Sequence, residues 1–191
     1  MKYFETIKID KGKVFYLPYH QWRIQNTIGR SLEFSLTPPD EDNLYRTKVI
    51  YDANGVLDIA YYPYTPKTIK EFVFVDGSHL DYKKKYLDRS GIEKLQLPQK
   101  ETEIIIVKDG LLSDTSIANL AFYDGKVWLT PKTPLLEGTT RKRYIEKGVL
   151  IEADIEKKDL LRFSKIATLN AMVDFAIIPN IELQKDRIIV K

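Results

Sequence analysis

The sequence predicts an α+β protein of two lobes, a small N-terminal α/β lobe over residues 1–77 and a larger, β-rich C-terminal lobe over residues 78–191. Strand-like runs recur along the whole chain, and helix-spaced segments interrupt them only at intervals. After Asp76-Gly77 the character changes, because a polar, lysine-rich passage begins there. With 191 residues, of which 43% are hydrophobic, the chain is long enough to bury a real core.

The N-terminal lobe is expected to consist of strands joined by short turns around one helix. The helix covers residues 19–34, where Trp22, Ile28 and Leu32 approximate helical spacing before a Pro-Pro pair breaks it. Asn54-Gly55 is the strongest hairpin signal. The expected strands are residues 3–9, 14–18, 47–52, 56–62 and 68–75.

The C-terminal lobe is expected to repeat a pattern of strand, Asp-Gly turn and strand. Residues 102–110 read as a buried strand that ends in such a turn, and residues 119–130 contain a second turn of this kind. A short helical pattern covers residues 90–95, and another helix is expected to begin near Thr139 or Thr140, either of which is a suitable N-cap. The final third of the chain reads as strand, helix and strand or loop pieces.

Composition and charge argue against several classes of function. Thirty Lys and Arg against twenty-seven Asp and Glu leave a net charge of +3, too little for a protein whose main partner is a nucleic-acid backbone. The chain has no cysteine, and its two histidines are too few for the usual metal cluster. No apolar run is long enough to cross a bilayer, and the start lacks a secretory signal, so we expect a cytoplasmic protein that does not bind membranes.

The stretch YKKKYLDRS, residues 82–90, carries three consecutive lysines. A charge run is usually a solvated surface, and this interpretation is favoured for Lys83 and Lys84. A phosphate or nucleic-acid patch is a second interpretation, against which the near-neutral total charge argues. A lysine that forms a Schiff base is the third, and it requires a site that desolvates the amine or holds a positive charge nearby. Spacing alone does not choose among the three.

Four separated segments carry motif-like patterns: YHQWR at residues 19–23, KYLDR at 85–89, LLSDTSIANLAFYDGKVWLTP at 111–131 and PLLEGTTRKRYI at 134–145. Together they resemble the class IV (fold-type IV) pyridoxal-phosphate enzymes, which include branched-chain and D-amino-acid aminotransferases and 4-amino-4-deoxychorismate lyase. KYLDR resembles the family's lysine, two variable residues, Asn or Asp, and Arg. The resemblance spans residues 4–176 and implies the family's two-lobed fold.

The resemblance implies that Lys85 carries pyridoxal phosphate and moves protons after a substrate amine displaces it. Asp114 falls where the family places a glutamate against the pyridine nitrogen, and a carboxylate there keeps the ring protonated so that it can accept electrons. Because aspartate is one methylene shorter, either the backbone lies closer, a water intervenes, or the electron sink is weaker. On local sequence alone, Asp114 is as readily a turn or capping acid beside Ser113 and Thr115.

For the cofactor phosphate, the resemblance implies the amide of Thr139 and the amide and hydroxyl of Thr140 at a helix start, with Arg23 as the cation. Asn170 and Ala171 are implied as further phosphate contacts, where relatives often carry two small hydroxyl residues. Taken alone, the Gly-Thr-Thr-Arg turn is an ordinary capped helix, and the segment TLNAM is equally a core strand or a turn.

Three other motif residues are given structural roles. Arg89 either pairs with a nearby aspartate or supports Lys85, and the structural role is preferred. His20 and Asn119 are expected to stabilise loops rather than to touch substrate.

Within this family the lysine-to-arginine spacing and the compactness look more like 4-amino-4-deoxychorismate lyase, which releases pyruvate and 4-aminobenzoate for folate biosynthesis. The alternatives are a class IV aminotransferase for branched-chain or D-amino acids, and a catalytically weakened protein that binds the cofactor or a partner. The last is suggested by Asp114 and by a shortened N-terminus, because most relatives carry an additional segment before the one that resembles FETIKI. A nucleic-acid binder ranks below these. The resemblance also implies a homodimer that acts on a small-molecule amine or amino-acid substrate.

Overall fold

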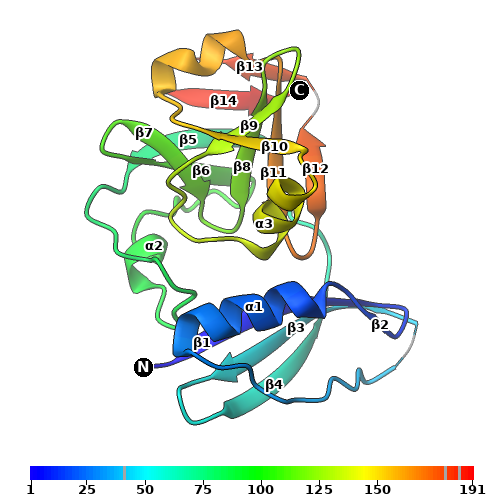
Figure 1. Cartoon of the computed structure of the whole chain (residues 1–191). Helices are drawn as coiled ribbons and strands as arrows, with labels where there is room; N and C mark the ends of the chain where they lie inside the picture. The colour runs from blue at the N-terminus through cyan, green and yellow to red at the C-terminus, as the bar shows by residue number, and fades with distance from the viewer. Residues whose placement is uncertain (41, 179, 185) are drawn as a thin grey trace. The chain divides into compact units, whose positions relative to one another are not determined.

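Two compact units make up the chain, and each is assembled from segments that are not contiguous in the sequence (Figure 1). The structure is a computed structural model that describes residues 1–40, 42–178, 180–184 and 186–191. The first unit contains Met1–Pro66 and Lys84–Asp88, and the second contains Lys67–Lys83 and Arg89–Lys191. Both units combine helix and strand, and the larger one is rich in strands, so the predicted α+β class is confirmed.

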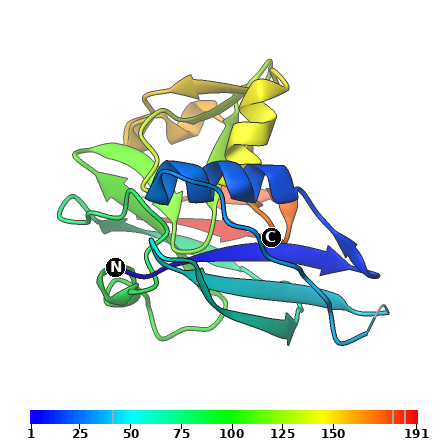
Figure 2. The ribbon, with the colours of Figure 1, turned by 60° about the horizontal axis from the view of Figure 1, so that its bottom comes forward.

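The first unit is a four-stranded antiparallel sheet with the order β2-β1-β3-β4 and one helix packed against it. Its strands are β1 (Tyr3–Asp10), β2 (Lys13–Val14), β3 (Leu44–Tyr51) and β4 (Val56–Pro63). Both expected hairpins are confirmed, because β1 pairs with β2 and β3 pairs with β4. Figures 1 and 2 show the helix, α1 (Leu17–Ile28), lying along this sheet.

The helix α1 ends earlier than the expected range of residues 19–34 because Gly29 stops it. Gly29 adopts the left-handed conformation, with φ of 82°, that commonly terminates helices. The buried side of α1 is largely polar and consists of His20, Arg23, Ile24 and Thr27. Ile24 joins the apolar core of this unit, whereas the polar members lead into the site described below.

The segment Lys84–Asp88 belongs to the first unit because it pairs with the edge of β1. The N–H of Phe4 donates to the carbonyl of Lys85 at 3.0 Å, and the N–H of Leu87 donates to the carbonyl of Lys2 at 2.9 Å. This pairing satisfies backbone groups that an open strand edge would leave exposed. Lys85 is thereby fixed to β1 through its own backbone.

The two units divide the chain differently from the expected boundary after residue 77. The strand β5 (Glu71–Asp76), expected in the first lobe, pairs in parallel with β6 (Thr102–Lys108) and belongs to the second unit. Lys85, expected in the second lobe, belongs to the first unit. Parallel strands are joined by long crossovers, so a local sequence pattern carries no sign of the partner.

The second unit contains two five-stranded sheets, with the orders β10-β9-β8-β11-β12 and β13-β14-β5-β6-β7. Its other strands are β7 (Leu111–Thr115), β8 (Asn119–Tyr123), β9 (Trp128–Pro131), β10 (Leu150–Ala153), β11 (Lys165–Asn170), β12 (Asp174–Ile178), β13 (Ile181–Leu183) and β14 (Arg187–Val190). Its helices are α2 (Ser90–Glu93), α3 (Thr139–Glu146) and a 3-10 helix, Lys157–Arg162. The expected strand pairs around the Asp-Gly turns and the helix near residue 139 are therefore confirmed.

An apolar core joins the two sheets of the second unit. Phe72 of β5, Ile105 of β6 and Leu112 of β7 cluster with Leu120 and Phe122 of β8. Burial of each such side chain contributes about 1.5–3 kcal/mol. This core holds β7 through Leu112 and β8 through Leu120 and Phe122, the two strands on either side of their connecting loop.

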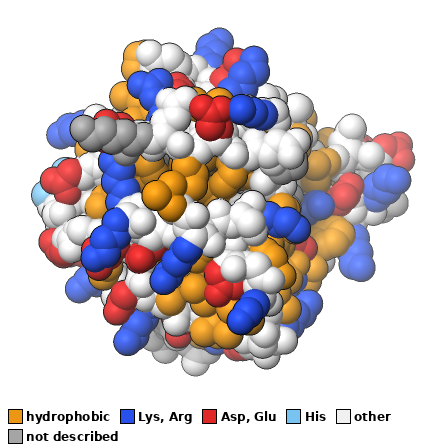
Figure 3. Space-filling model, turned by 90° about the horizontal axis from the view of Figure 1, so that it is seen from above, with side chains coloured by type: hydrophobic (Ala, Val, Ile, Leu, Met, Phe, Trp, Pro, Cys, Tyr) orange, Lys and Arg blue, Asp and Glu red, His pale blue; other side chains and the backbone are white. Residues whose placement is uncertain are grey.

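The surface carries charges of both signs. On the face drawn in Figure 3, Lys and Arg side chains are interspersed with Asp and Glu side chains. Among the residues that the structure describes, no helix is both long enough and apolar enough to span a bilayer.

Candidate active site

In the first unit, a carboxylate, an imidazole and a guanidinium are buried together. Glu5 lies on β1, where the odd-numbered side chains are buried, so it occupies a position that the alternation reserves for an apolar residue. Its Oε2 accepts a hydrogen bond from Nδ1 of His20 at 2.7 Å, and its Oε1 accepts one from Nε of Arg23 at 2.8 Å. A further bond from Nη2 of Arg23 to Oε2 makes the guanidinium pair bidentate.

The charges of this cluster follow from its burial. Burial raises the pKa of Glu5, but the charge of Arg23 and the hydrogen bonds from His20 and Arg23 outweigh it and hold this pKa at about 2. Burial lowers the pKa of His20, the hydrogen bond to Glu5 opposes this, and the charges of Arg23 and Lys85 lower the pKa further. His20 is therefore neutral at neutral pH. Because an ionised Glu5 can only accept, the proton of His20 is on Nδ1.

Lys85 lies beside the same cluster. Its Nζ is 4.6 Å from the centroid of the Phe4 ring, and its charge acts on the pKa of His20. An aromatic face attracts a cation. The charges of Lys85 and Arg23 both act on His20, so a second positive charge is present in the same cluster. A nearby positive charge is one of the two conditions that a Schiff-base lysine can meet.

The other two lysines of the run behave differently from Lys85. Lys84 donates its Nζ to the carbonyl of Thr27 at 2.7 Å, in the last turn of α1, where a cation complements the helix dipole. Lys83 is exposed, as a solvated surface residue would be. The expected surface role therefore fits Lys83, whereas Lys84 is tied to the end of a helix.

In the second unit, Asp114 is a buried carboxyl near the end of β7. Its Oδ1 accepts a hydrogen bond from Nδ2 of Asn119 at 2.8 Å, and its Oδ2 accepts one from the N–H of Leu136 at 2.9 Å. Burial raises the pKa of Asp114 to about 7, although the hydrogen bonds from Asn119 and Leu136 act in the opposite direction. Each carboxyl oxygen still has a lone pair for a further donor. A cationic donor placed there would favour the ionised form.

The chain that leads into α3 packs against the partner of Asp114. Gly138 is the N-cap of α3, so the expected cap by Thr139 or Thr140 is wrong. A Cβ atom at Gly138 would stand 1.7 Å from Oδ1 of Asn119, which explains the glycine at this position. Asn119 also donates its Nδ2 to the carbonyl of Leu136 at 2.9 Å. Asn119 thus links the carboxyl of Asp114 to the start of the helix.

The start of α3 has the properties of an anion site. Thr139 and Thr140 are buried there, and within the described part of the chain no side chain caps the helix. The N–H groups of a first helical turn have no partner inside the helix, and the helix dipole places partial positive charge on them. Arg141 fixes the helix, because its Nη2 donates to the carbonyl of Pro131 at 2.8 Å and to Oε1 of Glu152 at 2.6 Å.

The side chain of Asn170 organises the turn between β11 and β12. Its Oδ1 accepts hydrogen bonds from the N–H groups of Met172 and Val173 at 2.9 and 3.0 Å. Its Nδ2 donates to the carbonyl of Ile117 at 3.3 Å, in the loop between β7 and β8. Of the two interpretations of this segment, the strand holds as far as Asn170, the last residue of β11, and the turn begins at Ala171. A phosphate contact from either residue remains a prediction.

The structure groups the expected site residues by unit. Arg23 and Lys85 lie in the first unit, beside Glu5 and His20. The second unit holds Asp114, Thr139, Thr140, Asn170 and Ala171. His20 bonds to Glu5 on a strand and not to a loop, whereas Asn119 bonds to Asp114 and to the carbonyl of Leu136 in the chain before α3. Sequence patterns did not single out Glu5, although a carboxylate in the inward phase of an alternating strand is a readable signal for a buried charge cluster.

Comparison with known proteins identifies the family. The sequence model described as amino-transferase class IV matches residues 84–181. The chain belongs to this family. A protein of Haemophilus influenzae strain Rd with no characterised function is 35% identical over 182 residues, which are 88% of this chain and 96% of that protein. The resemblance inferred from four sequence segments is thereby confirmed.

Two solved structures show the same fold. A protein from Haemophilus somnus 129PT, provisionally named a 4-amino-4-deoxychorismate lyase, is 32% identical with a TM-score of 0.77 over 90% of this chain and 96% of that one. A hypothetical aminotransferase from Mycobacterium tuberculosis, with α-ketoglutarate and PMP bound, is 17% identical with a TM-score of 0.74 over 92% of this chain and 79% of that one. The class IV family is a family of pyridoxal-phosphate-dependent enzymes, and this protein is one of its enzymes.

The residues present fit pyridoxal phosphate. A phosphate is matched by the helix start at Thr139 and Thr140, where no side chain of the described chain acts as a cap. A protonated ring nitrogen is matched by Asp114, whose buried carboxyl lacks a cationic hydrogen-bond donor among the described residues. The amine of Lys85 is the group that could form a Schiff base with the aldehyde. Arg23 already pairs with Glu5, so part of its charge is offset before any phosphate is considered.

Proposed function

We propose that this protein is a 4-amino-4-deoxychorismate lyase, which releases pyruvate and forms 4-aminobenzoate in folate biosynthesis. The observation that carries the proposal is the uncapped, buried start of α3 joined through Asn119 to the buried carboxyl of Asp114. This pairing provides an anion site and a ring-nitrogen partner within one unit. The likeness to the Haemophilus somnus protein, over nearly the whole length of both chains, favours the lyase among the reactions of the family.

Each residue has a defined task in this proposal. The Nζ of Lys85 would hold the cofactor, and once the substrate amine displaces it, it would take a proton from the substrate carbon and return one later. Bound pyridoxal phosphate supplies an electron sink for the bond that breaks. The carboxylate of Asp114 would hold the ring nitrogen, and the start of α3 would hold the phosphate. Arg23, whose orientation is set by Glu5, would supply a positive charge to the phosphate.

The substrate experiment separates the lyase from an aminotransferase. The lyase converts aminodeoxychorismate to pyruvate and 4-aminobenzoate and needs no added 2-oxo acid as amino-group acceptor. Pyruvate release in the absence of an added acceptor therefore supports the proposal. Strict dependence on an added 2-oxo acid, with amino-group transfer, contradicts it and identifies a class IV aminotransferase. Cofactor binding with neither reaction identifies the third alternative, a protein whose catalysis is weakened.

The cofactor experiment tests the role of Lys85 independently of turnover. Protein incubated with pyridoxal phosphate is reduced with borohydride, and the labelled peptide is located by mass spectrometry. We expect the adduct on Lys85, and we expect Lys85→Ala to lose it. Lys84→Ala is the matched control. Lys84 is hydrogen-bonded to the end of α1, so its variant should keep the adduct on Lys85. An adduct that persists in Lys85→Ala contradicts the assignment.

The proposal includes a homodimer, as the family resemblance implies, and a location in the cytoplasm, as expected from the sequence. Light scattering during gel filtration measures the mass of the particle, for which we expect twice that of the chain. A mass of one chain for the active protein contradicts the dimer. Fractionation of cells that express the protein tests its location.

A further inference from the structure

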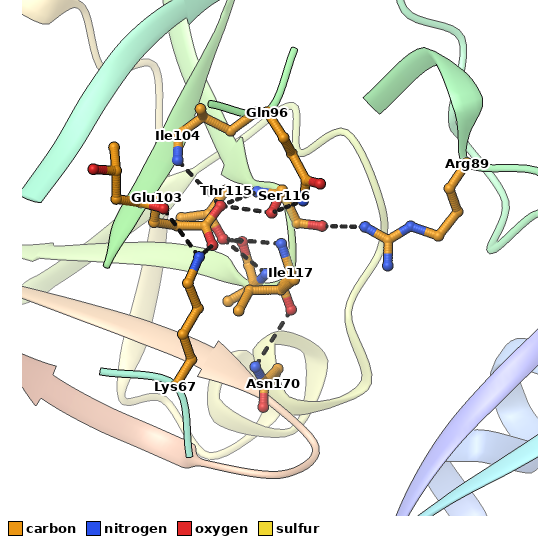
Figure 4. Close-up of polar contacts among 11 residues, drawn as sticks. Lys67, Arg89, Gln96, Glu103, Ile104, Thr115, Ser116, Ile117 and Asn170 are labelled. Atoms are coloured by element: carbon orange, nitrogen blue, oxygen red, sulfur yellow. Dashed lines mark hydrogen bonds and ion pairs between the residues drawn. The ribbon is translucent and has the colours of Figure 1, made fainter. Parts of the chain in front are cut away.

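Glu103 is a buried carboxylate outside the set of residues described above (Figure 4). It lies near the start of β6 and is 2% exposed. Its Oε1 accepts hydrogen bonds from Oγ of Ser116 at 2.6 Å, from the N–H of Ser116 at 3.2 Å and from the N–H of Ile104 at 3.1 Å. Its Oε2 accepts one from Nζ of Lys67 at 2.9 Å. A buried charge is tolerated only when it is paired and hydrogen-bonded in this way.

Ser116 is bonded at every polar group. Besides the two bonds to Glu103, its carbonyl accepts a hydrogen bond from Nη2 of Arg89 at 2.6 Å, and its Oγ accepts one from Nε2 of Gln96 at 3.1 Å. The preceding residue, Thr115, closes a tight turn, because its N–H and hydroxyl both donate to the carbonyl of Ala118. The loop between β7 and β8 is therefore held by residues of other segments, Arg89, Gln96 and Glu103, and also by hydrogen bonds of its own (Figure 4).

The residues that hold this loop occupy special places along the chain. Lys67 and Arg89 are the first residues of the two chain segments that make up the second unit. Lys67 is anchored on Glu103 and on the carbonyl of Thr102 at 3.0 Å, and Arg89 is anchored on Ser116. Both segments are thus fixed at their first residue to one small polar cluster within the second unit.

The same cluster is close in sequence to Asp114. Ser116 follows Asp114 by two residues. Two residues of chain span at most about 7 Å when fully extended. A shift of Ser116 is therefore passed over a short covalent path to Asp114.

We propose that Arg89 and Glu103 are positioning residues that hold the loop carrying Asp114 through one anchor, Ser116. This inference rests on the proposed function, in which Asp114 holds the ring nitrogen of the cofactor. Glu103 orients the N–H and Oγ of Ser116, and Arg89 orients its carbonyl. Neither residue needs to contact substrate for its loss to slow turnover.

The test compares Arg89→Ala with Arg187→Ala as a matched control. Arg187 is another arginine of the second unit. It pairs with the carboxylate of Glu71 at 3.1 Å, and its side chain is 50% exposed. For Arg89→Ala we expect kcat to fall about tenfold to a hundredfold with little change in KM, because displacement of a reacting group acts on the transition state. Borohydride labelling of Lys85 should remain complete. Arg187→Ala should match the wild type.

Chemical rescue distinguishes positioning from structural damage. Millimolar guanidinium ion should restore part of kcat in Arg89→Ala by occupying the vacated site, and Arg89→Lys should retain more activity than Arg89→Ala. Guanidinium should not raise the activity of Arg187→Ala. Equal kcat in Arg89→Ala and Arg187→Ala overturns the inference. A loss that follows only the folded fraction, without rescue by guanidinium or by lysine, also overturns it.

Hydrogen exchange on the protein without added cofactor gives a readout that does not depend on activity. Glu103→Gln keeps the shape of the side chain but turns an amide N–H toward either Lys67 or Ser116, which are both donors, so at least one hydrogen bond is lost. We therefore expect faster exchange of the backbone amide hydrogens over residues 111–123. Unchanged exchange in both Glu103→Gln and Arg89→Ala overturns the anchor. If wild-type Lys85 takes no label from pyridoxal phosphate, the proposed function fails, and the exchange result alone then decides whether the anchor exists.

Discussion

The side-chain amide of Asn119 donates to Oδ1 of Asp114 at 2.8 Å. The oxygen of the same amide fills the space where a side chain at residue 138 would begin. One asparagine therefore sets both the orientation of the buried carboxyl and the path of the chain into α3. The two proposed contacts to the cofactor, at its ring nitrogen and at its phosphate, share this single structural support.

Gly138→Ala should destabilise the protein through Asn119 and not through the backbone. The φ of −77° at Gly138 suits alanine, but the new Cβ would stand 1.7 Å from Oδ1 of Asn119. The side chain of Asn119 must move and lose its bonds to Asp114 and Leu136, at a cost of about 1–3 kcal/mol. Urea denaturation measures the change in the free energy of unfolding.

The double variant Gly138→Ala with Asn119→Ala tests this mechanism. Asn119→Ala removes the atoms that collide, so Gly138→Ala should cost much less in that background than in the wild type. Additive costs for the two substitutions would contradict the collision and point to a backbone effect at Gly138.

Asp114 should make the stability of the cofactor-free protein fall as pH rises. Its pKa is raised from 3.8 to about 7 by burial, so between these values the folded state binds a proton that the unfolded state has lost. The contribution is fully present below about pH 4 and is lost by about pH 7, with an amplitude on the order of a few kcal/mol. Urea denaturation across this window measures it.

Asp114→Asn should flatten this dependence because the amide does not titrate. At acid pH, where wild-type Asp114 is protonated, it should also lower stability by about 1 kcal/mol, since one oxygen cannot accept the bonds from both Asn119 and Leu136. This deficit should disappear and reverse as pH rises toward 7, because only the wild type loses stability there. Asp124→Asn is the control of opposite sign, because backbone hydrogen bonds from Val127 and Lys126 lower the pKa of Asp124. An unchanged slope in Asp114→Asn would show that Asp114 does not titrate in this range.

The sequence patterns succeeded where structure is local. Both hairpins of the first unit and the strand pairs of the second follow from alternation and from Asn-Gly and Asp-Gly turns. They failed where pairing is distant: β5 joins β6 across a crossover, and Lys84–Asp88 pairs with β1. The boundary between the units depends on these two pairings, so no local composition shift marks it.

The candidate site could be predicted from the sequence mainly through its resemblance to a family. Local patterns would have left Asp114 as a turn acid, whereas the structure buries it and bonds both of its oxygens. Local patterns also would not have predicted that Arg23 is buried, because the apolar residues of its helix are only weakly periodic. That face is irregular because it buries a guanidinium and an imidazole against Glu5 in place of apolar side chains.

Glu5→Gln should be among the most destabilising single substitutions in the first unit. It removes the charge that neutralises the buried guanidinium of Arg23, and loss of one partner of a buried ion pair costs about 3–5 kcal/mol. Because the pKa of Glu5 is lowered from 4.5 to about 2, its contribution is present above about pH 4.5 and is lost as pH falls toward 2. Denaturation by urea at neutral and acid pH measures both effects.

Asp10→Asn is the matched control for this prediction. Asp10 lies on the same strand and pairs with Lys8 at 3.6 Å, but its side chain is 35% exposed, so its loss should cost less than about 1 kcal/mol. The double variant Glu5→Gln with Arg23→Met removes both charges and should recover much of the stability. Equal stability of Glu5→Gln and Asp10→Asn would show that the buried pair contributes nothing.

Asn170 offers a prediction that separates its acceptor from its donor. Its Oδ1 accepts from Met172 and Val173, and its Nδ2 donates to the carbonyl of Ile117. Asn170→Asp keeps an acceptor for the two N–H groups and loses the donor, whereas Asn170→Ala loses all three bonds. We expect Asn170→Ala to cost about 1–2 kcal/mol and Asn170→Asp roughly half as much.

In both variants hydrogen exchange should quicken in the loop that contains Ile117, and only Asn170→Ala should also quicken exchange at Met172 and Val173. Equal exchange at Met172 in the two variants would show that the side-chain oxygen does not hold this turn.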